Sequence, residues 1–266
     1  MKNVFIEGIQ GMGKSTLLNT LAASFPEYQV CREGDCSQVD LAWCAWMTEE
    51  EYETALKRYS PLECGIESEL RKQAVRENRH FIVPYTKIIT DIPGFHKDME
   101  KFEIYNGRKT FREFKEIIFS RYENFSETGW LFECAFFQNI IEELMLFHLL
   151  SDDEILGFYR ELYDRVSNKE QFLLLYLYSD KIEDYIGLLQ RERCDDRGND
   201  MWYQLMLRYL AASPYGQKQK RGYPGFTELA AHFRHRQHLE LRIIREILSG
   251  RDVILPARDG KPSVSL

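Results

Sequence analysis

The sequence has no long apolar run and no paired cysteines, and each absence excludes a class of protein. No apolar stretch reaches the roughly eighteen residues that a membrane-spanning helix needs. The first apolar stretch runs into glycines rather than a cleavage site, so we expect no signal peptide. The cysteines form no C-x-x-C pair; they lie at positions 31, 36, 44, 64, 134 and 194. We therefore expect reduced thiols in a cytoplasmic protein, without zinc or a disulfide framework.

The chain also lacks an excess of basic residues. Its 35 lysines and arginines stand against 42 acidic residues, and the formal net charge is -7. A net negative protein does not attract nucleic acids or anionic membranes, so we expect neither as a partner. No repeat, low-complexity segment or Pro/Gly/Ser-rich linker divides the 266 residues. We therefore expect a single domain over residues 1–266.

What the sequence does contain is a phosphate-binding motif near its start. Residues 3–7 predict a short strand, and a complete G-x-x-x-x-G-K-[ST] pattern follows, leading into a predicted helix over 15–23. Glycines let backbone N–H groups curl around a phosphate, the lysine reaches the β- and γ-phosphates, and the serine hydroxyl binds Mg²⁺. The residues expected to bind nucleotide here are Gly8, Gly11, Met12, Gly13, Lys14, Ser15 and Thr16. ATP and Mg²⁺ are the expected cofactors.

Apolar and amphipathic segments alternate along the rest of the chain. Further strands are predicted at 28–31, 130–135, 172–178 and 252–256, with helices between them. Residues 61–78 and 139–150 predict helices, the second so apolar that we expect it to be covered on most sides. Pro84 limits residues 80–89 to an edge strand or a broken one. This alternation predicts an α/β fold with a parallel sheet.

Acidic residues follow two of the predicted strands. Glu33 comes just after the strand at 28–31, and parallel sheets place ligands at the carboxyl ends of their strands. A carboxylate there could accept a proton from a substrate hydroxyl, or could belong to a solvated turn. Glu133 lies near the end of the next strand and could hold Mg²⁺ or a water on it. The alternative for Glu133 is a structural role beside the following helix.

Arginine and aromatic side chains supply the remaining candidates. Arg191, Arg193 and Arg197 are close in sequence, and the first two do not share a helical face. Their guanidiniums could clamp phosphates from a lid, or could pair with Glu192, Asp195 and Asp196. Aromatic rings that could stack on a substrate, or simply fill the core, are Trp43, Trp46, Tyr85 and Tyr105.

With these features the chain resembles the P-loop nucleoside and nucleotide kinases, most of all thymidylate kinases and deoxynucleoside kinases. Residues 5–16 resemble the opening of a thymidylate kinase, and residues 175–197 are similar to that family's strand, helix and arginine lid. Arg32 and Glu33 stand where thymidylate kinases have Arg-Glu-Pro-Gly and deoxynucleoside kinases have a catalytic base. Gly34 replaces the proline, and Cys134 replaces an arginine that orients phosphate or base in the family.

The resemblance implies a fold, an activity and a set of site residues. The fold is a P-loop NTPase three-layer αβα sandwich, with a five-stranded parallel sheet of order 2-3-1-4-5, helical insertions and an arginine lid over about 186–200. The activity is Mg²⁺-ATP-dependent transfer of the γ-phosphate to a hydroxyl or phosphate of a small, nucleoside- or nucleotide-like acceptor. Lys14, Glu33, Arg191 and Arg193 would be catalytic, and Arg197 would bind nucleotide.

The acceptor side is expected in an insertion over residues 36–126. Residues that would contact the acceptor are Arg32, Trp43, Trp46 and Tyr85, and Ser15 and Glu133 would bind the metal. A homodimer is compatible with this family.

Other interpretations stay open. The acceptor could be a non-nucleoside hydroxyl compound such as an antibiotic or sugar. The chain could instead be a nucleotide-dependent switch or regulatory ATPase or GTPase acting through a protein partner. Residues 91–94 match the D-x-x-G pattern of GTPases, although no N-K-x-D motif accompanies them. His232, His235 and His238 lie three apart on a predicted helix among arginines, which favours a solvated basic face over a metal site.

Overall fold

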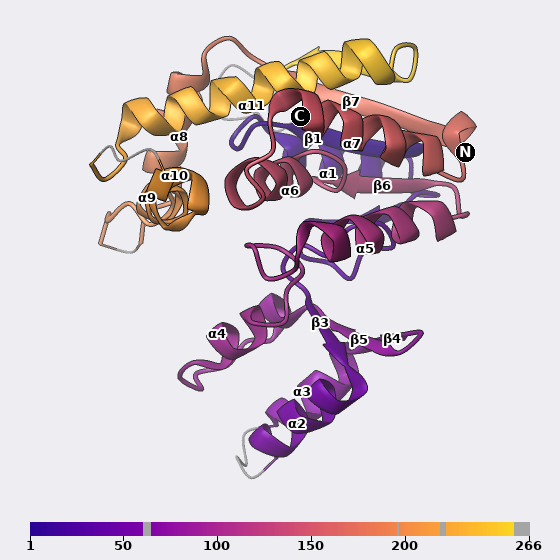
Figure 1. Cartoon of the computed structure of the whole chain (residues 1–266), viewed down its shortest axis with the longest axis vertical. Coiled ribbons are helices and arrows are strands. Elements are labelled where there is room, and N and C mark those ends of the chain that lie inside the picture. The colour runs from indigo at the N-terminus through magenta and orange to yellow at the C-terminus, as the bar shows by residue number, and fades with distance from the viewer. Residues whose placement is uncertain (61–64, 196, 219–221, 258–266) are drawn as a thin grey trace. The chain divides into compact units, whose positions relative to one another are not determined.

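The chain divides into two compact units, which Figure 1 shows along with their helices and strands. The computed structural model describes residues 1–60, 65–195, 197–218 and 222–257. Unit 1 comprises residues 1–30 and 126–266, and unit 2 comprises residues 31–125. The glycine-rich loop (residues 8–16) therefore belongs to unit 1, whereas Glu33 and the segment assigned to the acceptor side belong almost entirely to unit 2.

Unit 1 is built on a five-stranded parallel sheet, which confirms the expected α/β sheet. The strand order is β2-β6-β1-β7-β8, which becomes 2-3-1-4-5 when these five strands are numbered along the chain. The central β1 aligns Phe5 with Phe132 on one side and with Leu174 on the other. The strands are β1 (Asn3–Gly8), β2 (Gln29–Cys31), β6 (Trp130–Glu133), β7 (Phe172–Tyr178) and β8 (Asp252–Pro256).

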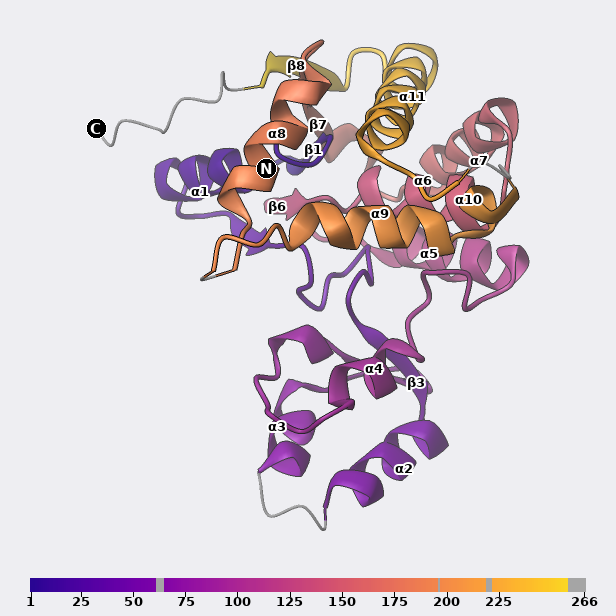
Figure 2. The ribbon, with the colours of Figure 1, turned by 90° about the vertical axis from the view of Figure 1, so that its left-hand side faces the viewer.

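Helices cover both faces of this sheet. Figure 2 shows α1 and α8 on one side of the strands, and α7 and α11 on the other. Because successive strand residues point to opposite faces, Val4 and Ile6 pack with Leu18 of α1, whereas Phe5 stacks on Phe132 at 5.0 Å. The helices are α1 (Lys14–Ser24), α6 (Gln138–Glu142), the π-helix η2 (Glu143–Phe147), α7 (Asp152–Arg165), the 3₁₀ helix η3 (Lys169–Gln171), α8 (Ile182–Glu192), α9 (Trp202–Ala212), α10 (Pro214–Lys218) and α11 (Phe226–Ile247). None of them, within the described ranges, is long and apolar enough to cross a membrane.

Unit 2 has its own sheet and its own core. Three antiparallel strands in the order β3-β5-β4 pack with helices, and Tyr52 stacks on Phe81 at 4.1 Å. Thr48 and Thr110 each begin a helix with a capping box, which satisfies first-turn N–H groups. The elements are β3 (Ala45–Thr48), α2 (Glu49–Tyr59), α3 (Ile66–Gln73), β4 (Val75–Glu77), β5 (His80–Val83), the 3₁₀ helix η1 (Tyr85–Lys87), α4 (Phe95–Glu100) and α5 (Phe111–Asn124).

Two secondary-structure predictions need correction. The helix predicted over 61–78 is shorter, because α3 ends at Gln73 and β4 follows; residues 61–64 lie outside the described ranges. Of the two alternatives for residues 80–89, the structure shows the broken strand: β5 ends before Pro84, which has no N–H to donate, and β5 is the central strand of its sheet. The helix predicted over 139–150 is α6 followed by the π-helical turn η2.

A pair of leucine truncations tests the packing of unit 1. Leu174 in the middle of β7 is 0% exposed, whereas Leu205 on α9 is 53% exposed. Leu174→Ala should lower the free energy of unfolding by about 2–5 kcal/mol, because it removes buried methyl groups and leaves a cavity. Leu205→Ala should change it by less than about 1 kcal/mol. Denaturant unfolding followed by circular dichroism measures both, and similar losses would contradict the core position of Leu174.

Candidate functional site

The glycine-rich loop joins β1 to α1 and is packed closely on its neighbours. Gly8 has φ 140°, and a Cβ there would lie 2.6 Å from the carbonyl oxygen of Leu177 in β7. Gly11 has φ 86°, and a Cβ there would lie 2.9 Å from Cδ1 of Leu189 in α8. Only glycine fits both positions without displacing its neighbours. The loop is therefore held between the end of β7 and the last turns of α8.

Lys14 begins α1 and folds back over the loop. Lys14 is only 7% exposed. Its Nζ donates to the carbonyl oxygens of Gly8 at 2.8 Å and Ile9 at 3.1 Å. Gly13, in the left-handed region with φ 93°, precedes the helix and provides no side-chain cap. An uncapped helix N-terminus directs N–H groups and a partial positive charge outward. The ammonium and the helix start thus give the loop positive character.

Ser15 and Glu133, the two predicted metal ligands, lie together. The Ser15 hydroxyl donates to Glu133 Oε1. Glu133 is the last residue of β6 and aligns with Ile6 of β1, so the sheet register places its carboxylate beside the start of α1. Hydroxyl and carboxylate oxygens are ligands of the type that Mg²⁺ prefers. Among the described residues, no group of three or more His, Cys, Asp or Glu side chains could hold a metal ion.

The predicted arginine lid follows the helix that touches the loop. Arg191 lies in the last turn of α8 and Arg193 is its C-cap, so both come shortly after Leu189. Both are exposed, and no ion pair joins either to a carboxylate among the described residues. Asp195 accepts from the backbone N–H of Arg197 at 2.9 Å and thereby shapes the turn. Asp196 lies outside the described ranges. The expected lid segment is thus a helix end followed by a tight turn.

In unit 2 the predicted acceptor residues have different surroundings. Glu33 accepts a hydrogen bond from Trp43 Nε1 at 3.1 Å, so these two predicted residues lie together. Trp43 is 45% exposed, Arg32 is exposed and Trp46 is half-buried. Tyr85 is only 3% exposed, and its hydroxyl donates to Glu103 at 2.5 Å within the core.

A buried group of charged side chains lies on α11, where we expected a solvated basic face. That expectation is wrong for two residues: Arg236 is 0% exposed and His232 is buried. Arg236 donates through Nη1 to Glu142 and through Nη2 to Oε1 of Gln10 in the glycine-rich loop, at 2.7 Å. His232 Nε2 lies 2.8 Å from the second oxygen of Glu142. The guanidinium therefore connects α11, α6 and the loop.

Two further carboxylates complete this group of charges. On α11, Glu240 Oε1 lies 3.0 Å from Arg236 Nε and forms an ion pair with it, although the two atoms are not aligned for a hydrogen bond. The other oxygen of Glu240 accepts a hydrogen bond from the Tyr176 hydroxyl at 2.5 Å. Glu7, the residue before the loop, accepts from the backbone N–H of Phe136 at 2.6 Å. The positions 232, 236 and 240 are four apart and share one helical stripe, and this spacing is the sequence signal that could have revealed the group.

Burial and charge set the protonation of these carboxyl groups. Burial alone would raise the pKa of Glu142, but the charges of His232 and Arg236 lower it to about 2. Burial raises the pKa of Glu7 from its ordinary value of 4.5 to about 7, against the backbone hydrogen bonds that favour the carboxylate. Burial also raises the pKa of Glu240, with Arg236 opposing. Glu142 is thus ionised at neutral pH, whereas Glu7 titrates there.

No protein-family model and no curated protein matches the chain.

The protonation of Glu7 should make the stability depend on pH. The folded protein binds this proton more tightly than the unfolded chain, so the free energy of unfolding should fall as pH rises from 4.5 to about 7. The loss should be on the order of 3 kcal/mol. Unfolding measured at pH 5 and pH 8 should show this loss in the wild type and a smaller one in Glu7→Gln. The exposed Glu27→Gln should keep the wild-type dependence, and an unchanged dependence in Glu7→Gln would refute the assignment.

The Arg236 ion pairs should matter far more than exposed ones on the same helix. Arg236→Met leaves Glu142 and Glu240 buried without their cation, so we expect a loss of about 3–5 kcal/mol in unfolding free energy. Arg242 also pairs with two carboxylates, Asp153 and Glu246, but at the surface. Arg242→Met should cost about 1 kcal/mol or less. Urea unfolding compares the two variants, and equal losses would show that burial adds nothing.

Proposed function

We propose that the chain is a Mg²⁺-ATP-dependent kinase for a small molecule, with a nucleoside- or nucleotide-like acceptor. The observation that supports this most strongly is the glycine-rich loop with Lys14 inside it and the Ser15 hydroxyl on Glu133. A lysine, a helix N-terminus and a hydroxyl–carboxylate pair are the groups that a triphosphate and its metal need. On this proposal the fold is that of a P-loop NTPase.

The residues present fit the nucleotide and the metal. Lys14 now bonds loop carbonyls, and its Nζ could turn from these neutral acceptors to the β- and γ-phosphates, whose charge it would compensate. Ser15 and Glu133 would hold Mg²⁺, which when bound neutralises charge on the phosphates. Gln10, fixed by Arg236, would keep the loop in shape while phosphate oxygens approach its backbone.

Two further roles complete the proposed chemistry. Arg191 and Arg193 are exposed cations at the C-terminal end of the helix packed on Gly11, so they are suited to bind the transferring phosphoryl group. Glu33, two residues beyond β2, would take the proton of the acceptor hydroxyl as the acceptor oxygen bonds to the γ-phosphorus and the bond to ADP breaks. Trp43 Nε1 would orient this carboxylate. Arg197 would add a nucleotide contact, and Arg32 an acceptor contact.

ADP release with purified protein tests the proposal. The protein is incubated with Mg²⁺-ATP alone and with separate pools of nucleosides, nucleotides, sugars and antibiotics. At least one pool should stimulate ADP release, and Lys14→Ala should reduce the stimulated rate by roughly 10²–10³-fold, because phosphate charge loses its partner. Glu33→Gln should reduce the same rate for a hydroxyl acceptor, whereas the exposed Glu53→Gln in unit 2 should not.

Two outcomes would argue against the kinase. ATP binding without stimulation by any pool would favour a switch or regulatory ATPase, because such proteins need no acceptor. Stimulated ADP release that persists in Lys14→Ala would show that the loop does not bind the reacting phosphates. Circular dichroism of each variant separates a lost contact from a lost fold.

A further inference from the structure

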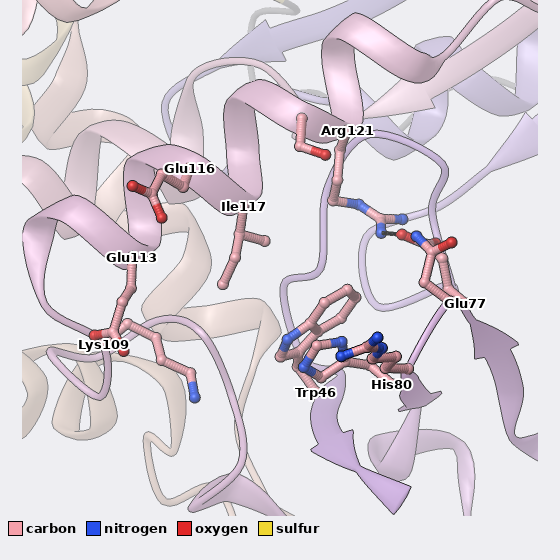
Figure 3. A pocket seen from close by; sticks show the side chains of 11 residues that line it. Trp46, Glu77, His80, Lys109, Glu113, Glu116, Ile117 and Arg121 are labelled. Atoms are coloured by element: carbon pink, nitrogen blue, oxygen red, sulfur yellow. Dashed lines mark hydrogen bonds and ion pairs between the residues drawn. The ribbon is translucent and has the colours of Figure 1, made fainter.

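Unit 2 contains a cavity whose lining includes Trp46, one of the residues expected on the acceptor side, but neither Glu33 nor Trp43. It lies between α5 and the sheet formed by β3, β5 and β4, and has a volume of about 500 Å³. Its lining comes from three separate segments: Trp46 of β3, the β4–β5 hairpin, and residues 109–121 (Figure 3). This volume lies within the range of small-molecule sites, roughly 300–1,000 Å³. All of the lining belongs to unit 2, so the cavity is a property of that unit alone.

A half-buried ion pair fixes one wall of the cavity. Arg121 of α5 is buried and donates through Nη1 to Glu77 of β4 at 2.6 Å, as Figure 3 shows. Its Nη2 donates to the carbonyl oxygen of Ser37, while Nε has no hydrogen-bond partner within the described ranges. A buried guanidinium held by two fixed acceptors is costly to move. The hairpin and α5 are therefore tied together, and the cavity between them is preformed.

Two aromatic rings lie beside this ion pair. Trp46 and His80 stack with centroids 4.4 Å apart and an angle of 20° between their planes, and both are half-buried. The Arg121 guanidinium lies 5.9 Å from the Trp46 ring. Burial lowers the pKa of His80, and the positive charge of Lys109 lowers it further. The His80 ring is therefore neutral at neutral pH. The pair offers a flat, uncharged surface on which another aromatic ring can stack.

Two cations of the lining stand outside the ion pairs of the described residues. Of the three carboxylates, Glu77 pairs with Arg121 and Glu116 with Arg112 at 3.3 Å, while Glu113 accepts from the N–H and hydroxyl of Thr110 and keeps its negative charge near Lys109. No ion pair joins Arg79 or Lys109 to a carboxylate in the part of the chain that the structure describes. Figure 3 shows Lys109 extending toward the open middle of the cavity, with Trp46 and His80 beyond it.

We infer that this cavity binds a compound with an aromatic ring and an attached phosphate or carboxylate. The ring stacks on the Trp46–His80 pair, and Lys109 and Arg79 hold the anionic group. The volume suits a molecule of the size of a nucleoside monophosphate. The inference does not rest on phosphoryl transfer in unit 1, and it gives unit 2 a binding site of its own.

Calorimetric titration of the full chain tests the site with adenosine monophosphate, thymidine monophosphate and indole-3-acetate. At least one of them should bind saturably, and adenosine, thymidine and ribose 5-phosphate, which lack the anion or the ring, should bind at least about tenfold more weakly. Preference for indole-3-acetate would identify a carboxylate ligand, and preference for a monophosphate would identify a phosphate ligand.

Variants locate the binding in unit 2. Trp46→Leu, Lys109→Gln and Arg79→Gln should each weaken binding by about tenfold or more, whereas Trp46→Phe keeps a ring and should retain it. Lys97→Gln, an exposed lysine of α4 outside the cavity, is the matched control. Lys14→Ala should leave the affinity unchanged, so a failed kinase assay and a failed cavity assay are distinguishable. Absence of saturable binding by all three probes at millimolar concentration, or binding unaffected by Lys109→Gln and Arg79→Gln, would overturn the inference.

Discussion

Arg236 carries a full charge with none of its side chain exposed, and much of unit 1 is arranged so that this charge is matched. Its guanidinium reaches Glu142 on α6, Glu240 on α11 and Gln10 in the glycine-rich loop. Removing ions from water is costly unless their partners are fixed, so the helices and the loop must keep one relative arrangement. The loop shape is therefore set by distant parts of the chain as well as by its own glycines.

The loop combines three constraints of different physical origin. Close packing requires glycine next to Leu177 and Leu189. Hydrogen bonding holds the Lys14 ammonium on loop carbonyls, and the sheet register brings Glu133 to the Ser15 hydroxyl. Each constraint restricts the same short segment and preorganises positive charge there, and the proposed triphosphate binding rests on that charge. Unit 2 balances charge differently, with one half-buried pair fixing a wall of a cavity whose lining also holds two cations that pair with no carboxylate among the described residues.

The sequence was most informative where one local pattern determines one structure. The apolar runs at 172–178 and 130–135 predicted strands that the structure contains, and the alternation of strands and helices predicted the parallel sheet. The prediction missed two strands of unit 2, β3 and β4, which are only four and three residues long. Such short strands exist because they pair with β5, and segments this short carry little local signal. Pro84 predicts an edge strand or a broken one over residues 80–89, and the structure shows a strand that ends before Pro84.

The sequence by itself determined the parallel α/β sheet and the motif of Gly8 to Thr16, because both follow from local residue order and strand periodicity. Only the tertiary structure decided which polar residues are buried together. His232 and Arg236 have the composition of a solvated helix face, yet α6 and β7 supply the carboxylate and hydroxyl groups that make their burial tolerable. A hydrogen bond joins residues more than two hundred positions apart, Gln10 and Arg236, and no periodicity in the sequence records such a contact.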